Sequence, residues 1–216
     1  MKKIAILATL FSGALFNSAM AAEKTVELQN FTALSAEKGI KLTIKCAEKS
    51  SLTAKGAQSA IDKLDISYDA NTLNLSNESN ENDNILTKTV TITLYTNKPL
   101  NNLSTMSGVK MDVDACAVGS ENLTVSGMMG SAITIEGKTK HLDLNLEAGA
   151  VFNQTSTKFS ADSAKIKLSM GARASLCHIP EITGNLTAGT KVDVSEEANV
   201  KIKSNFASEI SRDNCS

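Results

Sequence analysis

Apolar and polar residues alternate in short runs along most of the chain, and the runs recur roughly every 20 residues. Each run follows one of five glycines, Gly108, Gly130, Gly149, Gly171 and Gly189. The third and fifth residues after these glycines are apolar except for Gln154: Met111, Ile133, Phe152, Ala174 and Val192, then Val113, Ile135, Leu176 and Val194. The residues between them, such as Asp112, Thr134 and Asn153, are polar. A period of two predicts strands whose alternate side chains face the core and the solvent.

A second apolar row precedes the glycines. Leu103, Val125, Leu144 and Ile166 lie five residues upstream of the first four, and Gly184 interrupts the row in the last unit. Each unit therefore offers two strands, with a glycine suited to the tight corner between them. Repeats of this length are typical of solenoids. We expect an all-β fold, a single-stranded parallel β-helix (β-solenoid) with coils of about 20 residues.

The alternation is less regular towards the N-terminus. It returns at residues 64–66, 73–75 and 90–94, and the Asn- and Ser-rich run at 76–84 reads as a solvated loop. The length of the chain, 216 residues, suits one domain after removal of a leader. We expect a single domain at 22–216, with less regular strands at 22–99, regular repeats at 100–203 and a C-terminal tail at 204–216.

The first residues have the pattern of a Sec-type signal peptide. Lys2 and Lys3 precede an apolar run at 4–16, and small residues at 18–21 provide a cleavage site after Ala21. The apolar run is short for a bilayer span, and no later stretch approaches the roughly 20 apolar residues of a membrane helix. We expect residues 1–21 to be removed, no transmembrane segment in the mature chain, and a bacterial periplasmic or secreted protein.

The four cysteines are expected to form two disulfides, because thiols tend to pair in an oxidising compartment. In the expected solenoid Cys116 and Cys177 lie three coils apart, too far for a bridge. Two connectivities remain: Cys46–Cys116 with Cys177–Cys215, or Cys46–Cys177 with Cys116–Cys215. We favour the first, because a polar tail carrying Cys215 can fold back over the last coil.

Composition and charge narrow the range of functions. The chain has no Trp and only 4% aromatic residues, which indicates a core of small aliphatic side chains in rows. Its net charge is −1 with both signs interspersed, so no basic face suggests a nucleic-acid partner. We assign no metal site, because no C-x-x-C or H-x-x-x-H spacing occurs and only two histidines are present.

Four carboxylates, Asp112, Asp114, Glu136 and Asp193, fall at outward strand positions and form a possible binding face. Paired carboxylates on such a face could serve as acid and base in a glycosidase or lyase. The same rows hold Thr, Asn and Ser, which favours an ordinary solvated surface. His141 and Asp143 read as solvent-facing strand residues for the same reason. We assign no catalytic residue and no cofactor.

The chain resembles the head GIN domain family, exported bacterial proteins also described as auto-transporter adhesins. The resemblance is carried by Phe31 and Leu34, by the segments at 39–44, 73–75 and 90–94, by Pro99-Leu100, and by Leu103 with Ser107-Gly108, and it covers roughly residues 31–200. It implies an exported bacterial β-helix protein and names no catalytic residues. The four cysteines depart from the pattern of that family.

Two functions are compatible with these features. The first is a non-enzymatic envelope or surface module that binds a glycan or envelope protein in an adhesin-like way, because repeats build long polar surfaces. The second is a carbohydrate-active enzyme that uses the outward carboxylates. Cleavage of a polysaccharide by the purified protein would distinguish them.

Overall fold

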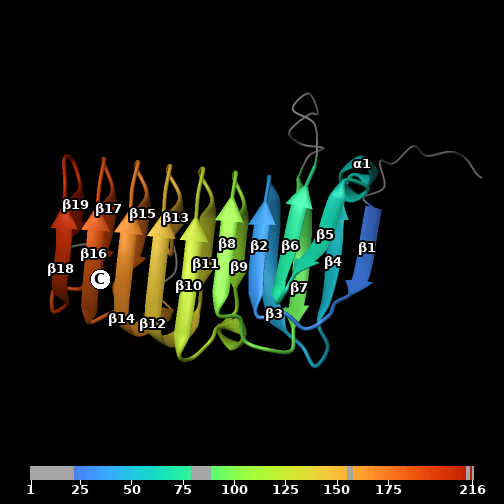
Figure 1. Ribbon diagram of the computed structural model, residues 1–216, viewed down its shortest axis with the longest axis horizontal. Helices are drawn as coiled ribbons and strands as arrows, with labels where there is room; N and C mark the ends of the chain where they lie inside the picture. Colours follow the sequence, from blue (N-terminus) through green and yellow to red (C-terminus); the bar gives the residue numbers. More distant parts are fainter. Residues whose placement is uncertain (1–21, 79–88, 155–157, 213–214, 216) are drawn as a thin grey trace, which may run out of the picture.

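Two β-sheets face each other and enclose the core in the computed structural model, which describes residues 22–78, 89–154, 158–212 and 215 (Figure 1). The signal peptide expected at 1–21 lies outside the described residues. One sheet has ten strands, in the order β1-β4-β7-β3-β9-β11-β13-β15-β17-β19. Their bounds are β1 (Ala22–Glu27), β3 (Ile40–Cys46), β4 (Ser51–Gly56), β7 (Val90–Thr96), β9 (Lys110–Val113), β11 (Ala132–Ile135), β13 (Val151–Phe152), β15 (Arg173–Leu176), β17 (Lys191–Val194) and β19 (Glu209–Ser211).

The second sheet has nine strands, in the order β18-β16-β14-β12-β10-β8-β2-β6-β5. Their bounds are β2 (Ala33–Glu37), β5 (Leu64–Asp69), β6 (Thr72–Asn77), β8 (Asn102–Met106), β10 (Asn122–Gly127), β12 (Gly137–Leu146), β14 (Phe159–Leu168), β16 (Glu181–Leu186) and β18 (Asn199–Ser204). A short helix α1 (Gln58–Ile61) and a 3₁₀ turn η1 (Ala115–Ala117) complete the described elements. Among these residues no helix has the length and apolar character needed to cross a bilayer.

From β8 onward the chain alternates between the two sheets, so that one repeat contributes one strand to each. Successive strands within a sheet are parallel and in register, for example Leu123 opposite Leu142 in β10 and β12, and Ile133 opposite Met111 in β11 and β9. Equivalent positions of neighbouring repeats therefore stack at the strand spacing of about 4.8 Å.

The first seven strands are arranged differently. β1 and β4 pair antiparallel, as do β4 and β7, and β5 and β6. β2 lies between β6 and β8, and β3 lies between β7 and β9, so spatial order does not follow chain order. Both sheets are consequently mixed, and the core lies between two opposed sheets. The prediction of a single-stranded parallel β-helix with coils of about 20 residues is therefore wrong.

The physical reason is that the pattern used for the prediction is local. Alternation reports which face of a strand is buried, and a repeat reports that units stack, but neither determines whether a neighbour is parallel or antiparallel. The antiparallel pairing of β1 and β4 depends on contacts far along the chain, for example Thr25 opposite Thr53 and Leu52 opposite Leu94.

The apolar rows form the core between the sheets. Met111, Ile133, Phe152, Ala174 and Val192 are all buried, as are Leu103, Val125, Leu144 and Ile166 of the facing sheet. One position departs from the alternation: Asn153 is only 3% exposed and Gln154 faces solvent, the reverse of the expected arrangement. β13 ends at Phe152, and Asn153 adopts a positive φ of 49°, which turns the chain out of the strand.

Candidate functional site

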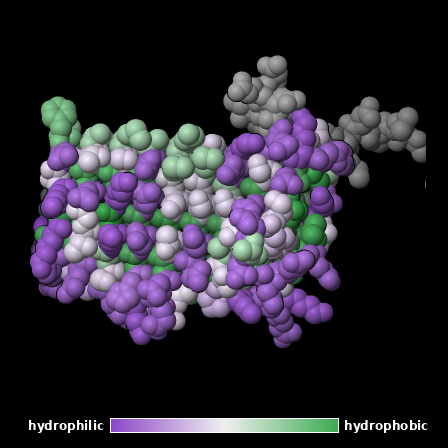
Figure 2. Space-filling view, in the orientation of Figure 1, coloured by the Kyte–Doolittle hydropathy of each residue, from purple (hydrophilic) through white to green (hydrophobic). Residues whose placement is uncertain are grey.

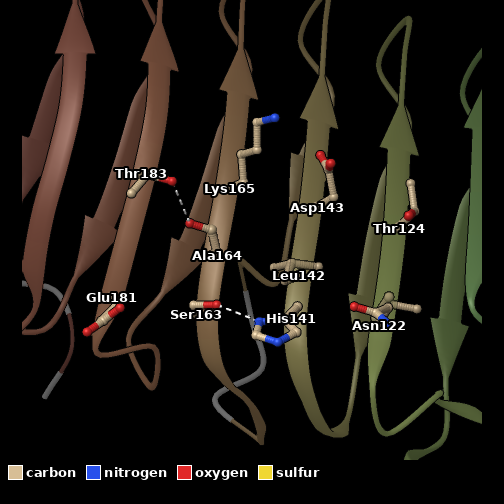
Figure 3. Close-up of a pocket in the computed structure, with 11 residues that line it drawn as sticks. Asn122, Thr124, His141, Leu142, Asp143, Ser163, Ala164, Lys165, Glu181 and Thr183 are labelled. Atoms are coloured by element: carbon tan, nitrogen blue, oxygen red, sulfur yellow. Dashed lines mark hydrogen bonds between the residues drawn. The ribbon is translucent and has the colours of Figure 1, made fainter.

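A shallow groove crosses the outer face of the nine-stranded sheet, over β10, β12, β14 and β16 (Figure 3). It has a volume of about 480 Å³. Its walls are mainly polar: Asn122, Thr124, His141, Asp143, Ser163, Lys165, Glu181 and Thr183, above a floor of Leu123, Leu142 and Ala164. The polar groups come from four neighbouring parallel strands, so the groove belongs to the rigid part of the fold.

The register of these strands sorts the polar side chains into two rows. Asn122, His141, Ser163 and Glu181 form one row, and Thr124, Asp143, Lys165 and Thr183 form the next. Parallel pairing without a shift places each member of a row beside its neighbour at about 4.8 Å. Asp143 and Lys165 thus project side by side, which brings an acceptor and a donor of opposite charge to the centre of the groove.

Hydrogen bonds orient part of the wall. The Nδ1 atom of His141 lies 2.9 Å from the Ser163 Oγ, across the β12–β14 pair. The Thr183 hydroxyl donates to the carbonyl oxygen of Ala164 at 3.5 Å. At the rim, Lys140 donates to the Glu121 carboxylate at 2.9 Å. The hydrogen bond from Lys140 and the negative charge of Glu121 raise the pKa of Lys140 above its usual value.

A smaller hollow of about 290 Å³ continues the groove along the strands and shares Asp143 and Lys165 with it. It is lined by Gly184 of β16, which lies opposite Ile166 of β14. Gly184 has a φ of +141°, and a Cβ atom added there would overlap the carbonyl oxygen of Ile166. Only glycine fits this backbone. The residue that interrupts the apolar row in the sequence is thus one of those that line the second hollow.

Comparison with known proteins identifies the family of this scaffold. The family model described as "Putative auto-transporter adhesin, head GIN domain" matches residues 30–212. The chain belongs to this family. The resemblance found in the sequence is therefore confirmed, and no curated protein matches the chain in sequence.

Two solved structures have a similar fold. A "putative adhesin" from Bacteroides fragilis NCTC 9343 is similar with a TM-score of 0.68 and 11% identity, covering 90% of this chain and 98% of that one. A "putative lipid binding protein" from Parabacteroides distasonis ATCC 8503 is similar with a TM-score of 0.51 and 10% identity, covering 88% and 96%. At such low identity the likeness concerns the fold alone.

The carboxylates predicted as a binding face of this head GIN domain lie on the opposite sheet from the groove. Asp112 on β9 and Asp193 on β17 are separated by β11, β13 and β15. Four strand spacings amount to about 19 Å, well beyond the roughly 5–9.5 Å between the acids of a glycosidase. These two carboxylates are not brought together.

Asp114 and Glu136 are closer, because each follows the end of a neighbouring strand, β9 and β11. The Glu136 carboxylate forms an ion pair with Lys158 at 3.2 Å, and both side chains are substantially exposed. Asp114 precedes η1. Neither of these two acids lines the groove or the smaller hollow beside it.

The cysteines lie at two other places in the head GIN domain. Cys46, at the end of β3, is bonded to Cys116 in η1, and Cys177, just after β15, is bonded to Cys215. This is the connectivity that the sequence favoured. Within the described residues no cluster of three or more His, Cys, Asp or Glu side chains is arranged to hold a metal ion.

The groove residues were missed by sequence reasoning. His141 and Asp143 were interpreted as ordinary solvent-facing positions, which is correct for each strand taken alone. The signal that identifies the groove is their register: His141 aligns with Ser163, and Asp143 aligns with Lys165, when the repeats are stacked. Stacking the units on their buried leucines would have placed these pairs together.

Proposed function

We propose that this chain is an exported, non-enzymatic module of the bacterial envelope or surface that binds a glycan in the groove of the nine-stranded sheet. The observation that supports this proposal is the in-register placement of His141, Asp143, Ser163 and Lys165 on adjacent parallel strands. A rigid sheet holds these groups in place before the ligand arrives, which lowers the entropic cost of binding.

A glycan suits the chemistry of the groove. Sugar hydroxyls both donate and accept hydrogen bonds, and the groove offers carboxylate, amide, hydroxyl, imidazole and ammonium groups within one surface. The groove is open and crosses four strands, and the smaller hollow beside Gly184 extends it along the strands for a chain-like ligand. An envelope protein is the alternative ligand.

Two observations support export of this protein: the description of its family and its two disulfides. The family description names an auto-transporter adhesin. Two disulfides in one chain are typical of oxidising compartments such as the periplasm or the cell exterior. We propose an extracytoplasmic location, with the leader at residues 1–21 removed during export.

The binding test uses the mature chain on an array of bacterial envelope polysaccharides, followed by titration of the best ligand. Asp143→Asn and Lys165→Gln should each weaken binding by about tenfold or more, since each removes a charged hydrogen-bonding partner. Asp112→Asn, on the opposite sheet, is the matched control and should bind like the wild type. Loss in Asp112→Asn with retention in Asp143→Asn would move the ligand to the other sheet and contradict the proposal.

Two further outcomes separate the alternatives. Binding to envelope fragments that survives periodate oxidation and is lost after proteolysis would identify a protein ligand. Cleavage of a polysaccharide that disappears in Asp112→Asn or Asp114→Asn would show a carbohydrate-active enzyme instead.

A further inference from the structure

A row of two-residue turns joins the nine-stranded sheet to the ten-stranded sheet along one edge of the molecule. Six of these turns are called here the turn edge: Ser107-Gly108, Met129-Gly130, Ala148-Gly149, Met170-Gly171, Ala188-Gly189 and Ala207-Ser208. Lys38-Gly39, between β2 and β3, continues the row beside Ser107. The first residue of each of the six turns has a positive φ, between 50° at Ala148 and 59° at Ser107. Six turns stacked at the strand spacing make an edge about 24 Å long.

The residues at the turn edge are unexpected for their conformation. A positive φ favours Gly, Asn or Asp, and exposure to water favours polar side chains. Five of the six turns begin with Met or Ala instead, and only the first begins with the polar Ser107. Met129 is 58% exposed, Met170 is 56% exposed, and Phe206 beside the last turn is 91% exposed. Figure 2 shows the resulting apolar band along the upper edge, over the loops that join the sheets in Figure 1. Neither local backbone preference nor solubility explains it.

The apolar character continues onto both flanks. Met106 and Met128 lie half-buried just before their turns, and Ala132 and Val151 lie half-buried just after theirs. Four of the five methionines that follow residue 21 are therefore at this edge. Methionine is flexible and polarizable, and proteins use it on surfaces that adapt to a variable apolar partner.

The backbone of the turn edge is already hydrogen-bonded along the row. The Gly108 amide donates to the carbonyl of Met129 at 3.0 Å, Gly130 donates to Ala148 at 2.9 Å, and Gly149 donates to Met170 at 2.9 Å. These amide and carbonyl groups therefore have hydrogen-bond partners within the protein. The edge thus presents apolar side chains with few directional groups, which suits a fluid apolar partner better than a protein surface with its own hydrogen bonds.

Basic residues flank the apolar band. The first outward residues after the turns form one row that includes Lys41, Lys110, Arg173 and Lys191, and Lys167 and Lys203 lie on the other flank. Acidic residues beside the turns are Glu37, Glu147 and Glu209, of which Glu209 is paired with Lys191 at 2.7 Å. Asp112 and Asp193 lie one outward position further from the turns, at the depth of Lys167 and Lys203, so the excess of basic residues is in the rows next to the turns. Cations beside an apolar ridge complement an interface that is anionic outside and apolar inside.

We propose that the turn edge docks on an anionic phospholipid surface. Met129, Met170 and Phe206 enter the boundary between headgroups and acyl chains, while Lys110 and Arg173 contact lipid phosphates. The molecule then stands on the bilayer by this edge, and the groove of the nine-stranded sheet remains open to its own ligand.

The test is co-sedimentation of the mature chain with vesicles of phosphatidylcholine alone and of phosphatidylcholine mixed with phosphatidylglycerol. The wild type should bind the anionic vesicles. The double variant M129N/M170N should bind them at least about tenfold more weakly, since two exposed apolar side chains are lost. Asn tolerates a positive φ better than Met, so this variant keeps the fold. The matched control A148N/A188N makes the same change in two other turns with little loss of apolar area and should bind within about twofold of the wild type.

A second variant tests the contribution of the basic residues to vesicle binding. K110Q/R173Q should reduce binding to anionic vesicles and leave the weak binding to phosphatidylcholine unchanged. Vesicle binding that M129N/M170N does not alter would overturn the proposal. So would a wild type that ignores vesicles and self-associates in sedimentation experiments, with M129N/M170N monomeric, because the edge would then be an interface between two copies. Asp143→Asn should bind vesicles like the wild type. Vesicle binding can therefore be tested independently of glycan binding in the groove.

Discussion

At the scale of single residues, the Asn153 carboxamide replaces the backbone pairing that β13 gives up. Its Oδ1 accepts a hydrogen bond from the Ile135 amide at 2.7 Å, and its Nδ2 donates to the Ile135 carbonyl at 3.3 Å. The side chain is buried and the backbone has a positive φ, a conformation that asparagine tolerates better than most residues. One side chain thus completes the ladder at the end of β11.

We expect Asn153→Ala to lower the free energy of unfolding by about 2–4 kcal/mol, because it leaves a buried amide unpaired and puts alanine in a left-handed conformation. Urea denaturation measures the change. Asn205→Ala, at an exposed position that keeps its backbone hydrogen bond to Leu186, should cost less than about 0.5 kcal/mol. Equal losses in the two variants would show that the Asn153 side chain does not complete the ladder.

At the scale of elements, burial alternates along each strand as the hydrophobic pattern requires. In β11, Ile133 is 1% exposed and points into the core, while Thr134 is half-buried on the outer face beside Asp112. A charge at position 133 would be buried without a partner, whereas a charge at position 134 can remain hydrated.

Ile133→Asp should therefore destabilise the protein by more than about 4 kcal/mol and prevent folding in much of the preparation. Thr134→Asp should cost about 1 kcal/mol or less, mostly through repulsion with Asp112 across the strand pair. Circular dichroism with urea titration of both variants provides the comparison. A mild effect at Ile133 would contradict the inward orientation of β11.

The same strands show how far the sequence allows prediction. Alternation correctly placed Ile133 and Ile135 in the core, because burial of one face is a local property of a strand. It failed at Asn153, where a single left-handed residue shifts the inward and outward positions by one. It also could not reveal that β2 and β3 insert between β6 and β8 and between β7 and β9, because strand order depends on contacts distant in sequence. The groove was missed for a different reason: His141 and Ser163 meet only across strands, and alternation describes each strand by itself.

At the scale of the whole molecule, the disulfides tie together parts of unequal stability. Cys46–Cys116 closes a sequence separation of 70 residues and joins the end of β3, which lies between β7 and β9 in the ten-stranded sheet, to η1. Cys177–Cys215 closes 38 residues and holds the chain after β19, the exposed last strand of that sheet. Arg212 fastens the same end, because its Nη1 donates to the carbonyls of Ser195 at 2.9 Å and Glu196 at 2.7 Å.

Removing either disulfide should increase the conformational entropy of the unfolded chain by a similar amount, which favours unfolding by about 4 kcal/mol. The folded states respond differently. Without Cys177–Cys215 the last strand can detach while the rest stays folded, so the native state regains much of that entropy. Cys177→Ser/Cys215→Ser should therefore lose less than about 2 kcal/mol, and Cys46→Ser/Cys116→Ser should lose about 4 kcal/mol. Hydrogen exchange should increase mainly in β17 and β19 in the first variant and throughout the sheet in the second.

Equal losses of the free energy of unfolding in the two double variants would contradict this difference between the disulfides. A linked peptide joining Cys116 to Cys177 in the unreduced protein would contradict the pairing itself.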